Sequence, residues 1–102
     1  MDISAQMSLF WGINKELALK IGVREAVLLE QIIELTDCYS SDYIYRTVDK
    51  LVEDTGFSKH EIRTFKKKLQ ELGLLEIEKR GMPAKHYMSV NFDKLESLIE
   101  NY

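Results

Sequence analysis

The sequence predicts a small, mostly helical α+β domain, and three observations support this prediction. Apolar residues recur every three or four positions over most of the chain, which is the spacing of amphipathic helices. The stretch 74–92 instead alternates apolar and polar residues on either side of the loop 81–84, as a β hairpin does. The length of 102 residues suits one core, and 45% apolar and 30% charged residues are ordinary for a globular protein. These values exclude a multidomain enzyme and a disordered chain.

The first third of the chain predicts an apolar segment and two helices. Residues 1–13 are an apolar lead-in that we expect to pack on the body of the domain. Asn14 is expected to cap a short helix that runs to Ile21 and stops at Gly22. A longer helix is expected over residues 23–37, with Glu30 and Glu34 in solvent. Its core-facing residues are predicted to be Val27, Leu28, Gln31, Ile32 and Leu35.

The next segment predicts a brief strand followed by two short helices. Residues 43–46 are aromatic and β-branched, which favours a strand. Thr47 is expected to cap a helix that ends at a glycine. Ser58, with Glu61 three positions later, has the capping-box pattern and opens a second helix. Two helices joined by a tight glycine turn are typical of a helix-turn-helix, here over residues 47–72.

The hairpin 74–92 directly follows the second helix, which is the arrangement of the winged variant. Tyr87 and either Met88 or Val90 are expected to face the core. Asp93 is expected to cap an apolar C-terminal helix over residues 93–102. The predicted fold is therefore a winged helix-turn-helix with a two- to three-stranded antiparallel sheet and an extra C-terminal helix, in a single domain over residues 1–102.

Five segments of the chain carry a resemblance to a known family. They are Phe10–Leu17, Tyr43–Thr47, Gly56–Ser58, Leu69–Leu75 and Arg80–Tyr87. Together they resemble the N-terminal winged-helix domain of phage and plasmid replication initiators and replisome organisers, over about residues 9–99. The resemblance implies binding of double-stranded DNA in replication initiation, replication proteins as further partners, and a tendency to dimerise.

The second helix of the motif has two distinct faces. At about 100° per residue, its apolar residues Ile62, Phe65, Leu69 and Leu72 form one stripe. In a winged helix the opposite face enters the major groove of DNA. Arg63 and Lys67 lie on that face, and we expect them to donate to guanine O6 and N7.

Further candidate contacts surround this face. Hydroxyl residues at the two helix N-termini are expected to meet phosphates, and basic residues at the wing tip are expected to meet the backbone or the adjacent groove. The complete set of candidate DNA-binding residues is Thr47, Ser58, Lys59, His60, Arg63, Thr64, Lys66, Lys67, Lys79, Arg80 and Lys85.

The distribution of charge leaves two kinds of function open. The net charge is −3, which opposes general binding to phosphates. Residues 57–86, however, hold eight basic and four acidic residues, while the remainder is strongly acidic. A localised basic face binds nucleic acid even on an acidic protein. The alternatives to a replication role are a winged-helix transcriptional regulator and a winged-helix protein-interaction module that does not bind DNA.

Catalytic motifs are missing from the sequence. The two histidines are far apart, the glycines are isolated, and no phosphate-binding loop or nucleophile elbow occurs. The carboxylates of Asp49, Glu53 and Asp54 are interpreted as a solvated helix face. We expect no enzymatic activity, no cofactor and no metal site.

The lone cysteine, Cys38, excludes an internal disulfide and a cysteine-based zinc site. Because it lies in an apolar helix, we expect a buried structural thiol. The N-terminal residues lack the features of a signal peptide, and no stretch approaches the roughly 18 apolar residues of a membrane span. These features predict a cytoplasmic protein without a membrane partner.

The apolar flanks of the chain predict self-association. The lead-in 1–13 and the C-terminal helix carry more apolar surface than a winged helix needs, which favours a homodimer through these two segments. The alternative is that they close the core of the monomer. Phe10, Trp11, Tyr43 and Tyr45 are interpreted as core or dimer-packing aromatics.

Overall fold

A computed structural model describes residues 15–99 of the chain. The predicted lead-in, the cap at Asn14 and the last three residues of the predicted C-terminal helix lie outside this range. The elements, in order, are α2 (Lys15–Ile21), α3 (Val23–Tyr39), β1 (Ile44–Tyr45), α4 (Val48–Thr55), α5 (Lys59–Glu71), β2 (Leu75–Arg80), β3 (Lys85–Val90) and α6 (Phe92–Leu98).

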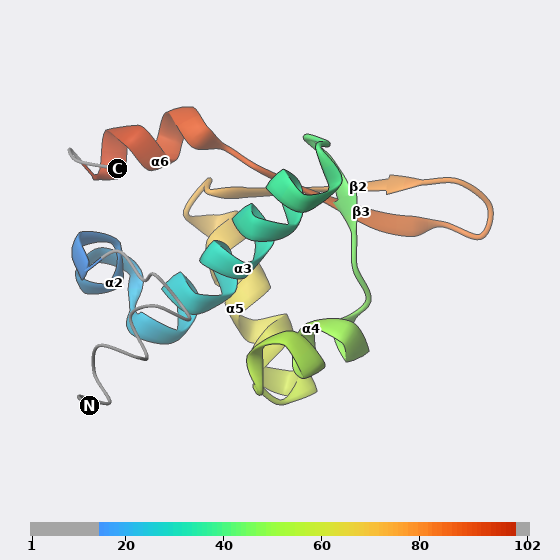
Figure 1. Cartoon of the computed structure of the whole chain (residues 1–102), viewed down its shortest axis with the longest axis horizontal. Coiled ribbons are helices and arrows are strands. Elements are labelled where there is room, and N and C mark those ends of the chain that lie inside the picture. Colours follow the sequence, from blue (N-terminus) through green and yellow to red (C-terminus); the bar gives the residue numbers. More distant parts are fainter. Residues whose placement is uncertain (1–14, 100–102) are drawn as a thin grey trace.

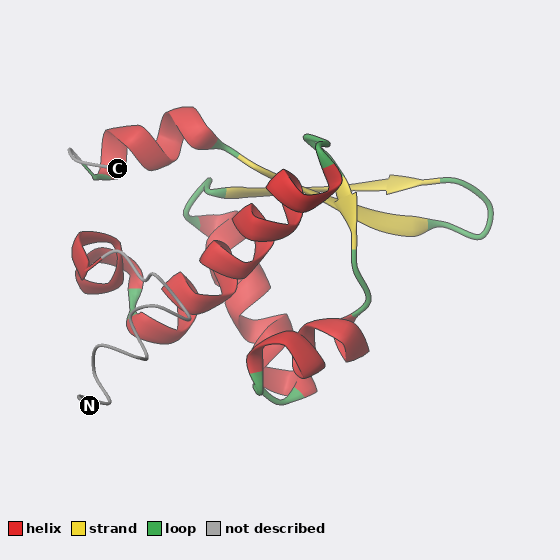
Figure 2. Cartoon of the chain, in the orientation of Figure 1, coloured by secondary structure: helices red, strands yellow, loops and turns green. Residues whose placement is uncertain are grey.

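The three strands form one antiparallel sheet in the order β1-β3-β2. Strand β1 contributes two residues, Ile44 opposite Met88 and Tyr45 opposite Tyr87. Strands β2 and β3 pair over their full length and form a long hairpin (Figure 2). The predicted fold class, a mostly helical α+β winged helix with a C-terminal helix, is confirmed.

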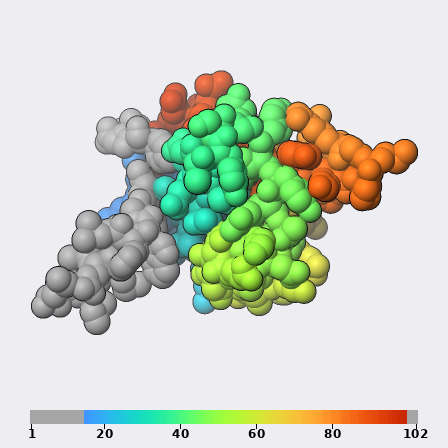
Figure 3. All heavy atoms as spheres, turned by 45° about the vertical axis from the view of Figure 1, so that its right-hand side comes forward, coloured from blue at the N-terminus to red at the C-terminus, as the bar shows by residue number. Residues whose placement is uncertain are grey.

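Helix α3 runs through the middle of the molecule, with α5 crossing behind it and the hairpin projecting to one side (Figure 1). Helix α5 packs against α3, α4 and β2. The core gathers apolar side chains from every helix and strand and includes Leu17, Leu29, Ile62, Met88 and Leu95. In the space-filling view the end of the hairpin stands out from this body (Figure 3).

Local hydrogen bonds define the helix-turn-helix as predicted. Thr47 accepts a hydrogen bond from the backbone N–H of Lys50 and caps α4. The turn after α4 needs a left-handed residue, and Gly56 supplies it with φ of 79° while its N–H donates to Val52 at 2.8 Å. Ser58 then caps α5. The two helices are therefore separated by three residues.

Helix α3 is predicted correctly in extent to within two residues, but its buried stripe is shifted. Leu29 is fully buried, whereas Val27 is only half-buried. Cys38 is exposed, so the prediction of a buried thiol is wrong. At about 100° per residue Cys38 falls well away from the stripe centred on Ile32, and an apolar helix does not bury every side chain near its end.

Three further predictions at the C-terminal side of the molecule are corrected. The cap of α6 is Asn91, which accepts from the N–H of Lys94, and not Asp93. Met88 faces the core, so its neighbour Tyr87 points to the opposite face of the sheet, where it is half-buried. Leu72 lies beyond the end of the core-facing stripe of α5 and is 38% exposed.

Candidate nucleic-acid interface

Helix α5 presents a basic outer face, as the sequence predicts. Its inner face is formed by Ile62, Phe65 and Leu69, which are buried. The residues on the outer side are exposed, and they carry no acidic group until the last residue of the helix. This outer strip consists of His60, Arg63, Thr64 and Lys67.

The start of α5 is held by a complete capping box. Ser58 accepts from the N–H of Glu61 at 3.1 Å, and the Glu61 carboxylate accepts from the N–H of Ser58 at 3.1 Å. The hydroxyls of Thr47 and Ser58 are thus engaged as acceptors, and each keeps its O–H to donate to a phosphate. Their predicted role as phosphate contacts is compatible with capping.

The Glu61 carboxylate makes the stability of the first turn of α5 depend on pH. Its hydrogen bonds to Ser58 hold its pKa below the ordinary value of 4.5, with the charge of Arg24 acting in the same direction. A carboxyl whose pKa is lowered on folding stabilises the protein above its unfolded pKa, and this stabilisation is lost as pH falls through the folded pKa. We expect wild type to be more stable than Glu61→Gln at neutral pH, and the two denaturation midpoints to converge well below pH 4.5. A midpoint difference that is independent of pH would contradict this.

Charged residues of α3 and α4 form ion pairs with α5. Glu25 lies 3.7 Å from the ammonium of Lys68, and Arg24 lies 3.3 Å from the carboxylate of Glu61. The pair of Arg24 and Glu61 is largely exposed, and such pairs contribute little to stability. These pairs compensate charges on the flanks of α5, so the uncompensated positive charge of the helix lies in the outer strip.

Two lysines assigned to the interface are less available than the sequence suggests. Lys59 pairs with Asp49 of α4 at 3.0 Å. Lys66 is half-buried, and this burial lowers its pKa, with the neighbouring charge of Arg63 adding to the effect. Both residues therefore border the outer strip and do not belong to it.

A partly buried ion pair fixes the entrance to α4. Arg46 donates two hydrogen bonds to Asp54, at 2.9 and 2.7 Å. This hydrogen bonding raises the pKa of Arg46 against the opposing effect of burial. The prediction that Asp54 belongs to a solvated face is therefore wrong, since it joins the end of α4 to the strand before it. Nothing in the spacing of eight residues indicates this pairing.

The wing cations divide between two faces of the hairpin. The guanidinium of Arg80 lies 4.4 Å above the ring centre of Tyr43 and forms an ion pair with Glu78 at 3.0 Å. The ammonium of Lys85 lies 5.0 Å from the ring centre of Tyr45. These contacts lie on the face of the sheet opposite the core. Lys79, two residues from the half-buried Ile77, belongs to the other face.

Tyr43 and Tyr45 are therefore not core aromatics, which corrects that part of the sequence interpretation, whereas their role in dimer packing stays a prediction. Tyr45 is 41% exposed, and its ring lies 5.8 Å from that of Tyr87. The alternation of Tyr43, Ile44 and Tyr45 contains the signal, because a buried central residue in a strand turns both neighbours outward.

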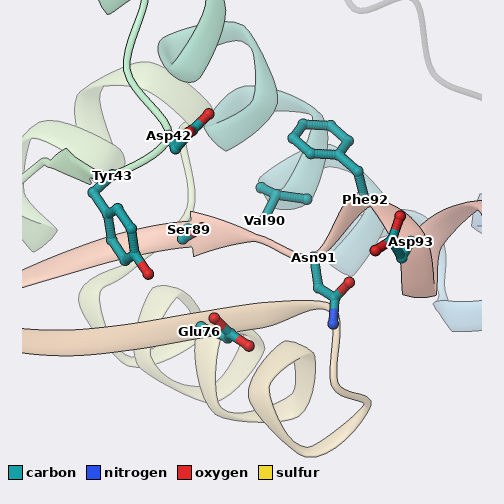
Figure 4. Close-up of a pocket in the computed structure, with 8 residues that line it drawn as sticks. All are labelled: Asp42, Tyr43, Glu76, Ser89, Val90, Asn91, Phe92 and Asp93. Atoms are coloured by element: carbon teal, nitrogen blue, oxygen red, sulfur yellow. The ribbon is translucent and has the colours of Figure 1, made fainter.

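A pocket of about 420 Å³ lies beside the face of the sheet opposite the core, between β1 and the start of α6 (Figure 4). The carboxylates of Asp42, Glu76 and Asp93 line it together with the rings of Tyr43 and Phe92. Three carboxylates repel phosphate. The pocket thus marks an acidic region of the surface, distinct from the outer strip of α5.

The described part of the chain shows few other candidate sites. Within residues 15–99 no cluster of three or more histidine, cysteine or carboxylate side chains is arranged to hold a metal ion. None of the helices in that range has the length and apolar character needed to cross a bilayer.

Comparison with known proteins shows similarity of fold. No family model and no curated protein matches the sequence. A solved structure described as the N-terminal domain of a DNA binding protein matches with a TM-score of 0.66 and 15% identity, over 99% of this chain and 94% of that one. A protein of Methanosarcina mazei Go1, described as a "possible transcriptional regulator", matches with a TM-score of 0.57 and 10% identity, over 98% of this chain and 75% of the other.

Proposed function

We propose that the domain binds double-stranded DNA by placing α5 in the major groove. The observation that carries this proposal is the outer strip of α5, in which Arg63 and Lys67 stand one turn apart, while the one carboxylate on this side of the helix, Glu71, is its last residue. Arginine and lysine donors on such a helix match the acceptors of guanine. The first similar structure, described as part of a DNA binding protein, supports the same function.

A role in initiating phage or plasmid replication is the finer form of the proposal. It is supported by the resemblance of the lead-in and the wing sequence to replication initiators and replisome organisers. A role in transcription is the second candidate, and it is supported by the description of the Methanosarcina mazei Go1 protein. Footprinting on the DNA that encodes this chain distinguishes the two roles, since an initiator protects origin repeats and a regulator protects promoters.

Binding of duplex DNA is tested by titration with salt. A protein that neutralises phosphates loses affinity linearly with the logarithm of salt concentration, with a slope of about −0.9 per phosphate. We expect the wild-type domain to show such a slope, and Lys67→Ala to weaken binding to the preferred duplex by about 1–3 kcal/mol, the usual contribution of a contact to guanine. Lys94→Ala is the matched control, because it removes the same charge from α6 and should leave this affinity unchanged. Weak binding that does not depend on salt would instead favour a protein-interaction module.

Of the two apolar segments predicted to form a homodimer, the C-terminal helix belongs to the core of the monomer. In α6 and the residue after it, Leu95 and Ile99 are core residues with 0% and 1% exposure, so they close the monomer. Self-association through the lead-in 1–13 stays a prediction. So does a single domain that extends over all 102 residues.

A further inference from the structure

The two faces of the hairpin differ near its tip. Lys79 is paired with His86, and Arg80 is paired with Lys85. Because alternate residues of a strand point to opposite faces, Lys79 and His86 share the face that carries the buried Met88. We name this the helix face, since α5 packs against β2 on that side. Arg80 and Lys85 belong to the opposite face, which we name the tyrosine face.

The cations of the tyrosine face are occupied within the protein. Arg80 lies 4.4 Å from the ring centre of Tyr43 and 5.5 Å from that of Tyr87. It is also paired with Glu78 at 3.0 Å. Each exposed contact between a cation and a ring favours the stacked arrangement about two- to fivefold. The acidic pocket adjoins this same face and opposes the approach of phosphate.

The polar side chains of the helix face are open. Lys79 and His86 are exposed, and within residues 15–99 neither side chain has an ion pair, hydrogen bond or ring contact. Both belong to the half of the hairpin next to the loop 81–84, where the residues of the two strands are exposed. Because α5 packs against β2 on the helix face, a duplex bound along α5 lies on the same side of the sheet as Lys79 and His86.

We propose that DNA meets the wing on its helix face, so that Lys79 and His86 contact phosphates beside the groove entered by α5. This inference rests on the proposed function. Lys79 supplies an ammonium and His86 a ring N–H donor, both of which suit a phosphate oxygen. Arg80 and Lys85, which the sequence predicts to be DNA contacts, instead lie against Tyr43 and Tyr45 on the tyrosine face.

The test compares adjacent residues that carry the same charge. Lys79→Gln and Arg80→Gln each remove one positive charge, from opposite faces of one strand. Duplex affinity is measured as a function of salt for both, with thermal unfolding as a check on folding. We expect Lys79→Gln to weaken binding about three- to tenfold and to reduce the salt slope by about one unit, and Arg80→Gln to leave the slope as in wild type.

A second pair of variants tests whether binding depends on the face of the hairpin or on the net charge of the protein. Lys85→Ala removes a full charge, whereas His86→Ala removes an imidazole. A general effect of net charge makes Lys85→Ala the more harmful change. The inference requires the reverse order.

The outcomes distinguish this inference from the proposed function. Equal or larger losses for Arg80→Gln and Lys85→Ala would overturn the inference, because DNA would then lie on the tyrosine face. If none of the four variants changes binding while Lys67→Ala does, the inference fails and the proposed function stands. If wild-type binding does not respond to salt, both fail.

Discussion

Arg63→Ala should reduce the discrimination between the preferred DNA site and random duplex by about 1–3 kcal/mol, which is the usual contribution of a bidentate contact to guanine. Arg63 is exposed in the middle of the outer strip, one turn before Lys67, and its guanidinium presents two parallel donors. Selection of bound duplexes from a random pool first defines the site. Competition binding with that site and a scrambled duplex then gives the discrimination for each protein.

The matched control for this prediction is Arg24→Ala. Arg24 is an exposed arginine on α3 that pairs with Glu61 at the side of α5, so its loss changes the net charge equally without altering the outer strip. We expect Arg24→Ala to leave discrimination within experimental error. If Arg63→Ala weakens the preferred and scrambled duplexes by the same factor, Arg63 contacts phosphate and does not read bases.

Leu69→Ala should lower the free energy of unfolding by about 2–5 kcal/mol, because deletion of a buried leucine side chain costs its transfer energy and leaves a cavity. Leu69 has 0% exposure and packs in the core from the inner face of α5. Leu72→Ala, one turn later on the same predicted stripe, should cost less than about 1 kcal/mol, since Leu72 is already 38% exposed. Urea unfolding measures both.

The same pair of variants tests how α5 is supported. Leu69→Ala should also weaken DNA binding when the folded fraction falls, whereas Leu72→Ala should bind as wild type does. Similar losses of stability for the two variants would mean that the apolar stripe stays buried to the end of the helix, contrary to the observed exposure of Leu72.

Interactions between close neighbours in the chain account for most of what the sequence predicts well. The caps at Thr47 and Ser58 join groups three residues apart, and the reversal after α4 depends on the φ of one residue, Gly56. The spacing of Ile62 and Phe65 likewise separates the buried side of α5 from its outer strip. The helix-turn-helix and the outer strip could therefore be predicted without knowledge of the rest of the fold.

Features that depend on contacts between distant segments could not be predicted in this way. Asp54 pairs with Arg46 across a strand–helix corner, and Cys38 is exposed because the core ends before the helix does. Proximity to the loop 81–84 in the sequence indicates which cations belong to the wing, but it does not indicate which partners each of them meets.

The sequence by itself determined the helix-turn-helix, its caps and the basic outer strip of α5, because hydrogen bonds over three or four residues and helical periodicity are local properties of the chain. Only the tertiary structure decided that the hairpin has a tyrosine face and a helix face. That division depends on β1, which is two residues long and brings Tyr43 and Tyr45 beside Arg80 and Lys85 from about 40 positions away in the chain. Alternation in the sequence indicates which residues of a strand share a face, but the partners that meet each face are set by packing, and here Ile44 and Met88 enter the core.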